Sequence, residues 1–269
     1  MKKLFLSLLL IVSLVSLAAC SNTSSNVFEF VLDESFTEYL VMETSADYPP
    51  YENIEEVDGK NTVVGVDIEI AKAIAFAAGK NLKVVHKGFD FLITDIQDGK
   101  ADFSIAAITP TPERMEQIDF SDVYLDSEND QVAIIKAADI DLYKSIDDIN
   151  LATIRVGAQT GSLQSYILQE QLPLSQAVYI QDIATLFASL SNGQLEALLS
   201  EVTVAQTYIS TEYSDLVIGF EIYSPYNGNA VAVQKGNTEL LAIINQTISE
   251  LKATDQIETW VDYYSSLYS

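Results

Sequence analysis

Arg114 is the residue whose type and position point most directly to chemistry. It is one of only two arginines in the chain, and it follows the apolar run 103–107 and Thr109. A guanidinium group is always charged, and its planar fork of donors fits a carboxylate through two parallel hydrogen bonds. Thr109 could add a hydroxyl to the same anion. The segment also allows a second interpretation, in which Arg114 pairs with a nearby acid such as Glu113 on a surface turn.

Two further positions could bind the charged ends of a small molecule. Gly161 and Ser162 follow a strand-like run and open the helical pattern 163–168, so backbone N–H groups there could bind an anion; Ser162 could also be a simple helix cap. Glu201 ends the apolar run 195–200 and could bind a cation. Its alternative role is a solvated acid in the first turn of the helix expected at 202–209.

Nucleophilic, acid–base and metal chemistry have little support in the residue types. His86 is the only histidine, and a role at the end of a strand is expected for it. No nucleophile has a partner base, and the single cysteine, Cys20, cannot build a thiolate metal site or a disulfide. We expect neither a cofactor nor a metal, and no enzymatic activity.

The first twenty residues predict an exported protein. Lys2 and Lys3 precede the apolar run 4–17, which is shorter than the roughly 20 residues that a membrane-spanning helix needs. The run closes with Leu-Ala-Ala-Cys at 17–20, small residues before a cysteine that mark a processing site. We therefore expect a signal peptide at 1–19.

The net charge and the chain length limit the expected partners and the number of domains. The formal net charge is −25, and loss of Lys2 and Lys3 would make it about −27. A field of this sign repels nucleic acids, so no nucleic-acid partner is expected, and it mildly favours cationic solutes. The length is enough for two domains of ordinary size.

Helical and strand-like patterns alternate along the chain, which predicts an α/β fold with mostly parallel sheets flanked by helices. Helices are expected at 67–78, where Gly65 makes a turn and Asp67 a cap, at 89–97, and at 240–251 and 257–264 near the end. The short apolar runs between helices are expected to be strands: 82–85, 103–107, 131–135, 153–156, 178–180, 197–199 and 231–233.

We expect two lobes that are interleaved in sequence. Residues 20–37 would form a flexible tether, 38–129 and 229–269 lobe 1, and 130–228 lobe 2. The chain would cross between the lobes near 129–135 and 226–233, and these crossings would act as hinges.

Six segments occur in an order and spacing that resemble the solute-binding proteins of bacterial uptake transporters for polar amino acids, the extracellular solute-binding family 3. The resemblance covers nearly the whole chain after the signal peptide. The segments are DYPPYE (47–52), GVDIEIAKAI (65–74), GKAD (99–102), TPER (111–114), DFSDVY (119–124) and VGAQTGS (156–162).

This resemblance implies a two-lobed, type II periplasmic-binding-protein-like fold that closes on one amino acid by a hinge motion. Arg114 matches the arginine that binds the ligand α-carboxylate, with Thr109 beside it and Ala107 offering backbone groups. Gly161 and Ser162 would provide a second contact to that carboxylate.

The resemblance also assigns the rest of the pocket. Glu201 falls where the family has an acid for the ligand ammonium group. Tyr48 and Phe89 match two aromatic positions that enclose the ligand side chain, although Phe89 could also be a core residue.

The ligand class stays broad at this point. Ser45 stands where some binders of basic amino acids carry aspartate, which weakens a cationic assignment. The polar residues Glu43, Asp47, Glu52 and Gln164 are close enough in sequence to contact a polar side chain. Glutamine, histidine, arginine and lysine are the expected ligands.

The resemblance implies a monomer that works with ABC transporter permease subunits. It also implies cleavage before Cys20 and attachment of lipid, including palmitate, to that residue, which would anchor the protein to the outer face of the membrane. Two alternatives stay open: an amino-acid sensor that feeds a receptor, and a dehydratase-type enzyme on the same fold.

Overall fold

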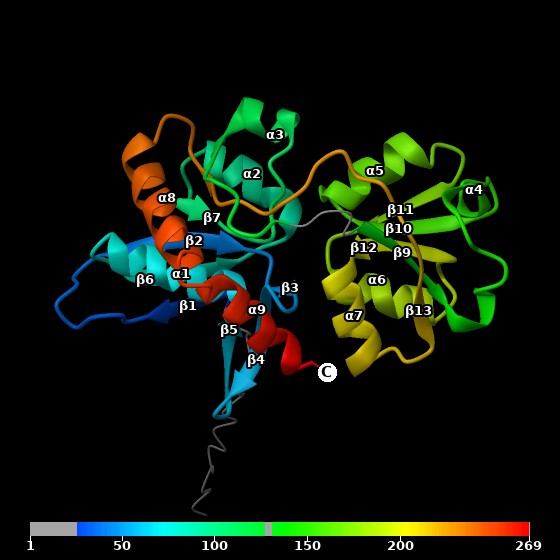
Figure 1. Ribbon diagram of the computed structural model, residues 1–269, viewed down its shortest axis with the longest axis horizontal. Coiled ribbons are helices and arrows are strands. Elements are labelled where there is room, and N and C mark those ends of the chain that lie inside the picture. The colour runs from blue at the N-terminus through cyan, green and yellow to red at the C-terminus, as the bar shows by residue number, and fades with distance from the viewer. Residues whose placement is uncertain (1–25, 127–130, 269) are drawn as a thin grey trace, which may run out of the picture.

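The computed structural model describes residues 26–126 and 131–268. The expected signal peptide, Cys20 and the start of the first expected crossing lie outside the described residues. Within the described part, two separate sheets form two lobes that lie side by side in Figure 1. In those same ranges, no helix combines the length and the apolar character needed to cross a membrane.

Lobe 1 is built on a six-stranded sheet with the order β1-β6-β2-β7-β14-β8. Its strands are β1 (Val27–Phe30), β2 (Tyr39–Thr44), β6 (Asn81–His86), β7 (Phe103–Ser104), β8 (Asp119–Phe120) and β14 (Ala232–Val233). Its helices are α1 (Val66–Ala77), α2 (Phe89–Gln97), α3 (Pro112–Gln117), α8 (Thr238–Lys252) and α9 (Gln256–Ser266). The chain therefore returns to lobe 1 for its last strand and last two helices (Figure 1).

The expected tether is wrong in its second half. β1 pairs antiparallel with β6, Val27 opposite Val85 and Phe30 opposite Leu82, and so forms the edge of the sheet. The side chains of β1 alternate between the two faces of the sheet, as in any strand: Phe28 is buried, while Val27 and Glu29 are exposed. The folded part thus begins about ten residues earlier than the sequence pattern indicated.

Lobe 2 contains a five-stranded sheet with the order β11-β10-β12-β9-β13. Its strands are β9 (Gln131–Lys136), β10 (Arg155–Gln159), β11 (Gln176–Ile180), β12 (Ala197–Glu201) and β13 (Leu216–Glu221). Its helices are a 3-10 turn (Ala137–Asp139), α4 (Ile146–Ile149), α5 (Leu163–Gln171), α6 (Ile183–Ser191) and α7 (Val202–Thr211).

Both sheets are mixed, not mostly parallel as expected. β2 is parallel to β6 and β7, and β10 is parallel to β11 and β12. The strands that follow the crossings, β9 and β14, run antiparallel to their neighbours. A strand that enters a lobe from the other lobe arrives without a crossover helix, so nothing requires it to run parallel.

Two crossings join the lobes, one between β8 and β9 and the other between β13 and β14. They are paired with each other, because Leu125 and Asn229 form an isolated antiparallel bridge and the N–H of Tyr124 donates to the carbonyl of Asn229 at 2.9 Å. The role of the crossings as hinges stays a prediction.

A small antiparallel sheet of β3 (Asp47–Tyr48), β4 (Glu52–Val57) and β5 (Lys60–Val64) was not expected from the sequence. Its turn has a clear local cause: Asp58 and Gly59 both have positive φ, 53° and 76°, which is the backbone of a tight two-residue hairpin turn. Glu52 is the first residue of β4 in this sheet.

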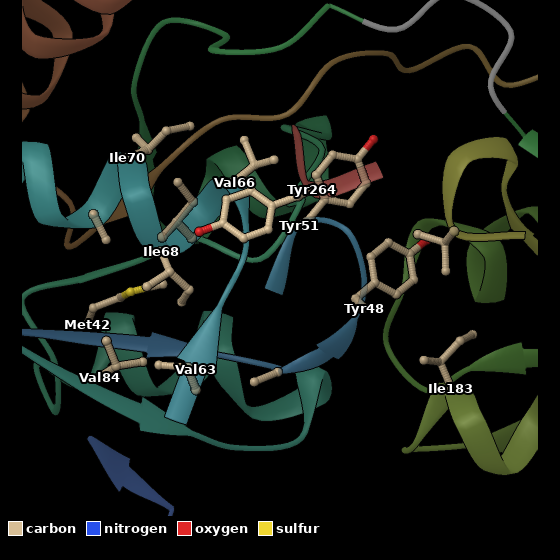
Figure 2. Packing of buried hydrophobic residues seen from close by; sticks show 14 of the residues in the cluster. Met42, Tyr48, Tyr51, Val63, Val66, Ile68, Ile70, Val84, Ile183 and Tyr264 are labelled. Carbon is tan, nitrogen blue, oxygen red and sulfur yellow. The ribbon is translucent and has the colours of Figure 1, made fainter. Parts of the chain in front are cut away.

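The main buried cluster continues from lobe 1 into lobe 2. It joins the face of α1 and β2, with Met42, Ile68 and Ile70, to residues of α6 such as Ile183. In Figure 2, Tyr48 lies on the side of lobe 1 that faces Ile183, at the boundary between the lobes. Contact between the lobes is therefore partly apolar.

Tyr268, just after α9, contacts both lobes. Its hydroxyl donates to Glu55 on β4, and its backbone carbonyl accepts the hydroxyl of Ser210 on α7 at 2.5 Å. The segment that follows the last helix therefore reaches across the opening between the lobes, where Figure 1 places it beside α7.

Gly65→Ala should destabilise the protein strongly. Gly65 has φ of 131°, and an added Cβ would lie 2.1 Å from the carbonyl oxygen of Tyr51, so we expect a loss of about 3 kcal/mol or more in the free energy of unfolding. Gly59→Ala is the control, since its φ of 76° is also positive but its Cβ would meet nothing within 4 Å; it should cost about 1 kcal/mol. Urea denaturation measures both, and equal losses would contradict the argument.

Candidate functional site

The site is a small cavity of about 20 Å³ between the lobes. Space of this size holds about one water molecule. An amino acid is larger, so the lobes or the lining side chains must move to admit one. The lining residues are Ser45, Tyr48, Glu52, Phe89, Ala106, Ala107, Thr109, Arg114, Gln131, Gln159, Ser162, Leu163, Gln164 and Glu201.

The structure brings together all the predicted ligand-binding residues except Gly161 in this lining. Gly161 instead lines an adjoining groove of about 620 Å³, which Arg114 and Ser162 also line. The binding roles of these residues stay predictions.

Arg114 is held by the short helix α3. The helix is capped by Thr111, whose hydroxyl oxygen accepts the N–H of Arg114 at 3.3 Å, and Pro112 occupies its first turn. The guanidinium donates through Nη1 to the carbonyl of Thr109 at 2.8 Å and through Nη2 to that of Gly161, in the other lobe, at 3.0 Å. Its carbon lies 5.4 Å from the centroid of the Phe89 ring.

The surface interpretation of Arg114 is wrong, since the residue is only 8% exposed. Burial lowers the pKa of Arg114 to about 10, with Glu113 opposing the shift. Its two described hydrogen bonds go to neutral carbonyls, and a guanidinium has five N–H donors. Donors therefore remain for an anion at a place where a charged partner would offset the cost of burial.

Gly161 and Ser162 differ in part from the prediction. Gly161 faces Arg114 through its carbonyl, not its N–H. The N–H of Ser162 donates to the carbonyl of Gln159 at 3.2 Å, and its hydroxyl oxygen accepts the N–H of Ser165 at 3.1 Å. The helix-cap interpretation of Ser162 is confirmed, whereas its N–H is already bonded.

Ala107 has an unusual backbone for a residue with a side chain, with φ of 45°. Its N–H donates to Oδ2 of Asp67 at 2.8 Å, so this donor is not available to a ligand. Asp67 is correspondingly not a helix cap, which corrects the sequence-based expectation. It is fully buried inside the first turn of α1 and also accepts the hydroxyl of Tyr124 at 2.8 Å.

Glu201 is the last residue of β12 and is only 4% exposed. The solvated alternative for this residue is therefore wrong. Its side chain makes no capping hydrogen bond to α7, although it occupies the N-cap position. The carboxylate lies in the cavity wall with Gln131, its neighbour across the antiparallel β9–β12 pair.

The aromatic and amide residues complete the wall. Tyr48 stacks on Tyr51 with ring centroids 6.1 Å apart, and Phe89, the first residue of α2, belongs both to the wall and to a hydrophobic cluster of lobe 1. The amide of Gln164 donates to Oε1 of Gln131 at 2.7 Å and to the hydroxyl of Tyr48 at 3.5 Å.

Glu52 belongs to the cavity, whereas the sequence indicated only that it is close enough to contact a polar side chain. It is the first residue of β4 and is 0% exposed. Burial raises the pKa of Glu52 well above its usual value, with a further contribution from nearby Asp67, while the pKa of Asp67 is raised to about 6 by its own burial. The Asp58–Gly59 turn signal could have revealed the hairpin and this position with it.

Asp47 connects the lobes and is not itself a lining residue of the cavity. Its Oδ2 accepts the N–H of Ile183, the first residue of α6, at 2.9 Å, and its carbonyl accepts the hydroxyl of Tyr208 at 2.9 Å. Ser45 donates to Oδ1 at 2.9 Å. Enclosure raises the pKa of Asp47 to about 6, against the opposing effect of these donors.

His86 has a structural role, as expected. Its Nδ1 accepts the N–H of Ala46 at 2.9 Å, and burial lowers its pKa. In the described ranges, no group of three or more histidine, cysteine or acidic side chains is arranged to hold a metal ion.

Residues 40–266 match the profile of the bacterial extracellular solute-binding proteins, family 3. The chain belongs to this family. It is 33% identical over 264 residues to the arginine-binding extracellular protein ArtP of Bacillus subtilis (strain 168), and the match covers 96% of each protein.

Solved structures agree with this membership. An amino acid ABC transporter substrate-binding protein of Streptococcus pneumoniae, bound to L-arginine, has a TM-score of 0.80 at 32% identity, over 85% of this chain and 94% of that one. An ancestral amino acid-binding protein, a precursor of cyclohexadienyl dehydratase, has a TM-score of 0.75 at 26% identity, over 84% and 95%. The expected two-lobed fold is thereby confirmed.

Asp47→Ala should shift the unliganded protein toward an open form. The change removes the acceptor of an interlobe hydrogen bond, which should cost the closed form about 1 kcal/mol. Small-angle X-ray scattering should show a larger radius of gyration. Asp182→Ala is the control, because Asp182 caps α6 within lobe 2, through the N–H of Thr185. A scattering curve for Asp47→Ala that superimposes on those of the wild type and the control would contradict this role.

Proposed function

We propose that the chain is the substrate-binding subunit of an ABC uptake transporter, and that it captures arginine in the interlobe cavity and delivers it to the membrane permease. The observation that carries the proposal is the buried Arg114 guanidinium, which faces a cavity that also contains Glu201 and Glu52. Each charge on this wall corresponds to a charge on the ligand.

The matching can be followed group by group. The α-carboxylate of the ligand would bind Arg114, which is buried with only neutral partners, and the α-ammonium group would bind Glu201 in the other lobe. A side-chain guanidinium would then reach Glu52. Arginine carries a net charge of about +1 at neutral pH, and the three ionised side chains carry −1 together, so the closed site would be neutral.

Two further observations support a cationic side chain. Two aromatic residues, Tyr48 and Phe89, line the wall, and a guanidinium is attracted to aromatic rings. Ser45, which weakened this assignment at first, lies on the same wall as Glu52, and Glu52 supplies the carboxylate that Ser45 lacks. Relatives named for arginine point the same way.

We also propose that the protein is exported and carries lipid on Cys20. The support is the sequence at 17–20 and the membership in an extracellular family. The first described strand begins at Val27, only a few residues beyond Cys20, so the folded part would lie close to the membrane and its permease.

A binding role is favoured over catalysis, although one structural neighbour is a dehydratase precursor. His86 is outside the cavity wall, and its Nδ1 is bonded to Ala46. The charged groups on the wall are the three that match the ligand. A sensor that feeds a receptor would use the same cavity, and loss of arginine uptake on gene deletion would distinguish transport from sensing.

Arg114→Ala should remove most of the affinity for every amino acid that binds. A carboxylate enclosed with no charged partner loses about 2–5 kcal/mol, which corresponds to at least about a thirtyfold increase in Kd. Calorimetric titration of the mature chain with each of the twenty amino acids measures this, and arginine should bind most tightly to the wild type. Glu201→Gln should weaken binding less.

The other arginine supplies the control. Arg155 pairs with Glu196 at 2.5 Å, away from the cavity, so Arg155→Ala should leave Kd within about twofold of the wild type. A similarly small change for Arg114→Ala would show that the proposed carboxylate contact is wrong.

A further inference from the structure

Glu52 has unusual surroundings for an ionised acid. Its carboxyl group is 0% exposed, and the nearby carboxyl group of Asp67 acts to raise its pKa. Neither oxygen of Glu52 receives a hydrogen bond from any N–H or hydroxyl donor in the described part of the chain. Burying an ionised carboxylate without donors is costly, and a protonated carboxyl group avoids the cost of the buried charge.

The proton belongs on Glu52. Asp67 already accepts the N–H of Ala107 on Oδ2 and the hydroxyl of Tyr124 on Oδ1, and both contacts favour its ionised form. Glu52 has no such donors, and burial raises its pKa well above the usual value. In the cavity Glu52 is therefore the neutral acid, and Asp67, with its two donors, is the ionised one.

The groups that face Glu52 are mostly acids. Asp67 on α1, Asp47 on β3 and Glu201 at the end of β12 all act to raise its pKa, and the neutral hydroxyl of Tyr124 lies behind Asp67. Arg114 is the only cation among the lining residues, and both of its described bonds go to carbonyls. Such a cluster attracts one more positive charge, which can be a proton or a cationic ligand group.

We propose that Glu52 exchanges its proton for the cationic side chain of the ligand, so that capture of a cationic amino acid releases a proton while capture of a neutral one does not. The inference rests on the proposed function, since it concerns the same cavity. It identifies Glu52 as the residue that determines the preference for a charged side chain.

The sign of the pH dependence follows from the exchange. Before binding, Glu52 is protonated, and an adjacent guanidinium favours its ionised form. The bound state therefore holds fewer protons, and affinity for a cationic ligand rises with pH until Glu52 ionises without the ligand. A neutral ligand leaves Glu52 protonated, so its affinity lacks this rise.

The test compares arginine with citrulline, whose side chain has nearly the same shape but ends in a neutral urea group. Both ligands carry the same α-amino and α-carboxyl groups, so titration of those groups cancels in the comparison. Calorimetry in two buffers of different ionisation enthalpy at about pH 6.5 counts the protons released. We expect arginine to release up to about one proton more than citrulline.

Glu52→Gln tests the assignment to this residue. The amide is nearly the same size and is neutral at every pH, as the protonated acid is, but it has no proton to release. We expect the difference in proton release between the two ligands to vanish and the preference for arginine over citrulline to fall by about tenfold or more. Glu56→Gln, an exposed change of the same type on the same strand, should leave both quantities as in the wild type.

Equal proton release by arginine and citrulline in the wild type would overturn the inference, even if arginine binds tightly, and the proposed function would then still stand. Retention of the difference in a folded Glu52→Gln variant would also overturn it. Should that variant fail to fold, the comparison of ligands in the wild type decides alone. Absence of saturable binding of either ligand to the wild type would instead reject the proposed function and this inference with it.

Discussion

The electrostatic cost of enclosing Arg114 is the constraint on which the cavity depends. A guanidinium that leaves water loses the free energy of its hydration, and hydrogen bonds to two carbonyl acceptors offset only part of that loss. One of these carbonyls belongs to Gly161 in the opposite lobe, so the same side chain that faces the cavity also contributes to contact between the lobes. If Arg114 binds an anion as proposed, closure and anion binding would be coupled through one group, because the anion would supply the missing charge.

The rest of the junction is arranged around that group. Asp47 binds the start of α6, and Gln164 contacts Tyr48, so polar contacts between the lobes surround an apolar region that includes Ile183. Individually such hydrogen bonds contribute about 1 kcal/mol, which suits a protein that must open again to release its cargo. The two crossings are bridged to each other at Leu125 and Asn229.

Much of the site could be predicted because its residues are placed by local patterns. The expected helix at 89–97 has the bounds of α2, which puts Phe89 at the cavity. Arg114 was found because an isolated arginine after an apolar run is rare in an acidic chain. The position of Ser162 at a helix N-terminus could be predicted because serine is a preferred N-cap residue and a helical pattern follows it.

The features of the site and fold that could not be predicted depend on contacts between segments far apart in the sequence. Asp67 resembled a helix cap because of its local position, whereas its partners, Ala107 and Tyr124, lie about 40 and 57 residues away. The direction in which Gly161 faces is set by Arg114, and the strands beside the crossings run antiparallel because of how the lobes are joined. The burial of Glu52 could not be predicted, because the hairpin on which it lies was not expected from the sequence.

The position of Tyr268 suggests a way to follow the proposed opening and closing of the lobes in solution. Its side chain contacts Glu55 in lobe 1 while its carbonyl contacts Ser210 in lobe 2, so its surroundings differ between the joined and separated arrangements. A fluorescent dye attached there would change its emission as the lobes part, outside the cavity and without touching the captured molecule. Because the sequence has a single native cysteine, at position 20, thiol labelling at an introduced cysteine would need only that residue to be replaced, which would turn the chain into an optical sensor for its own cargo.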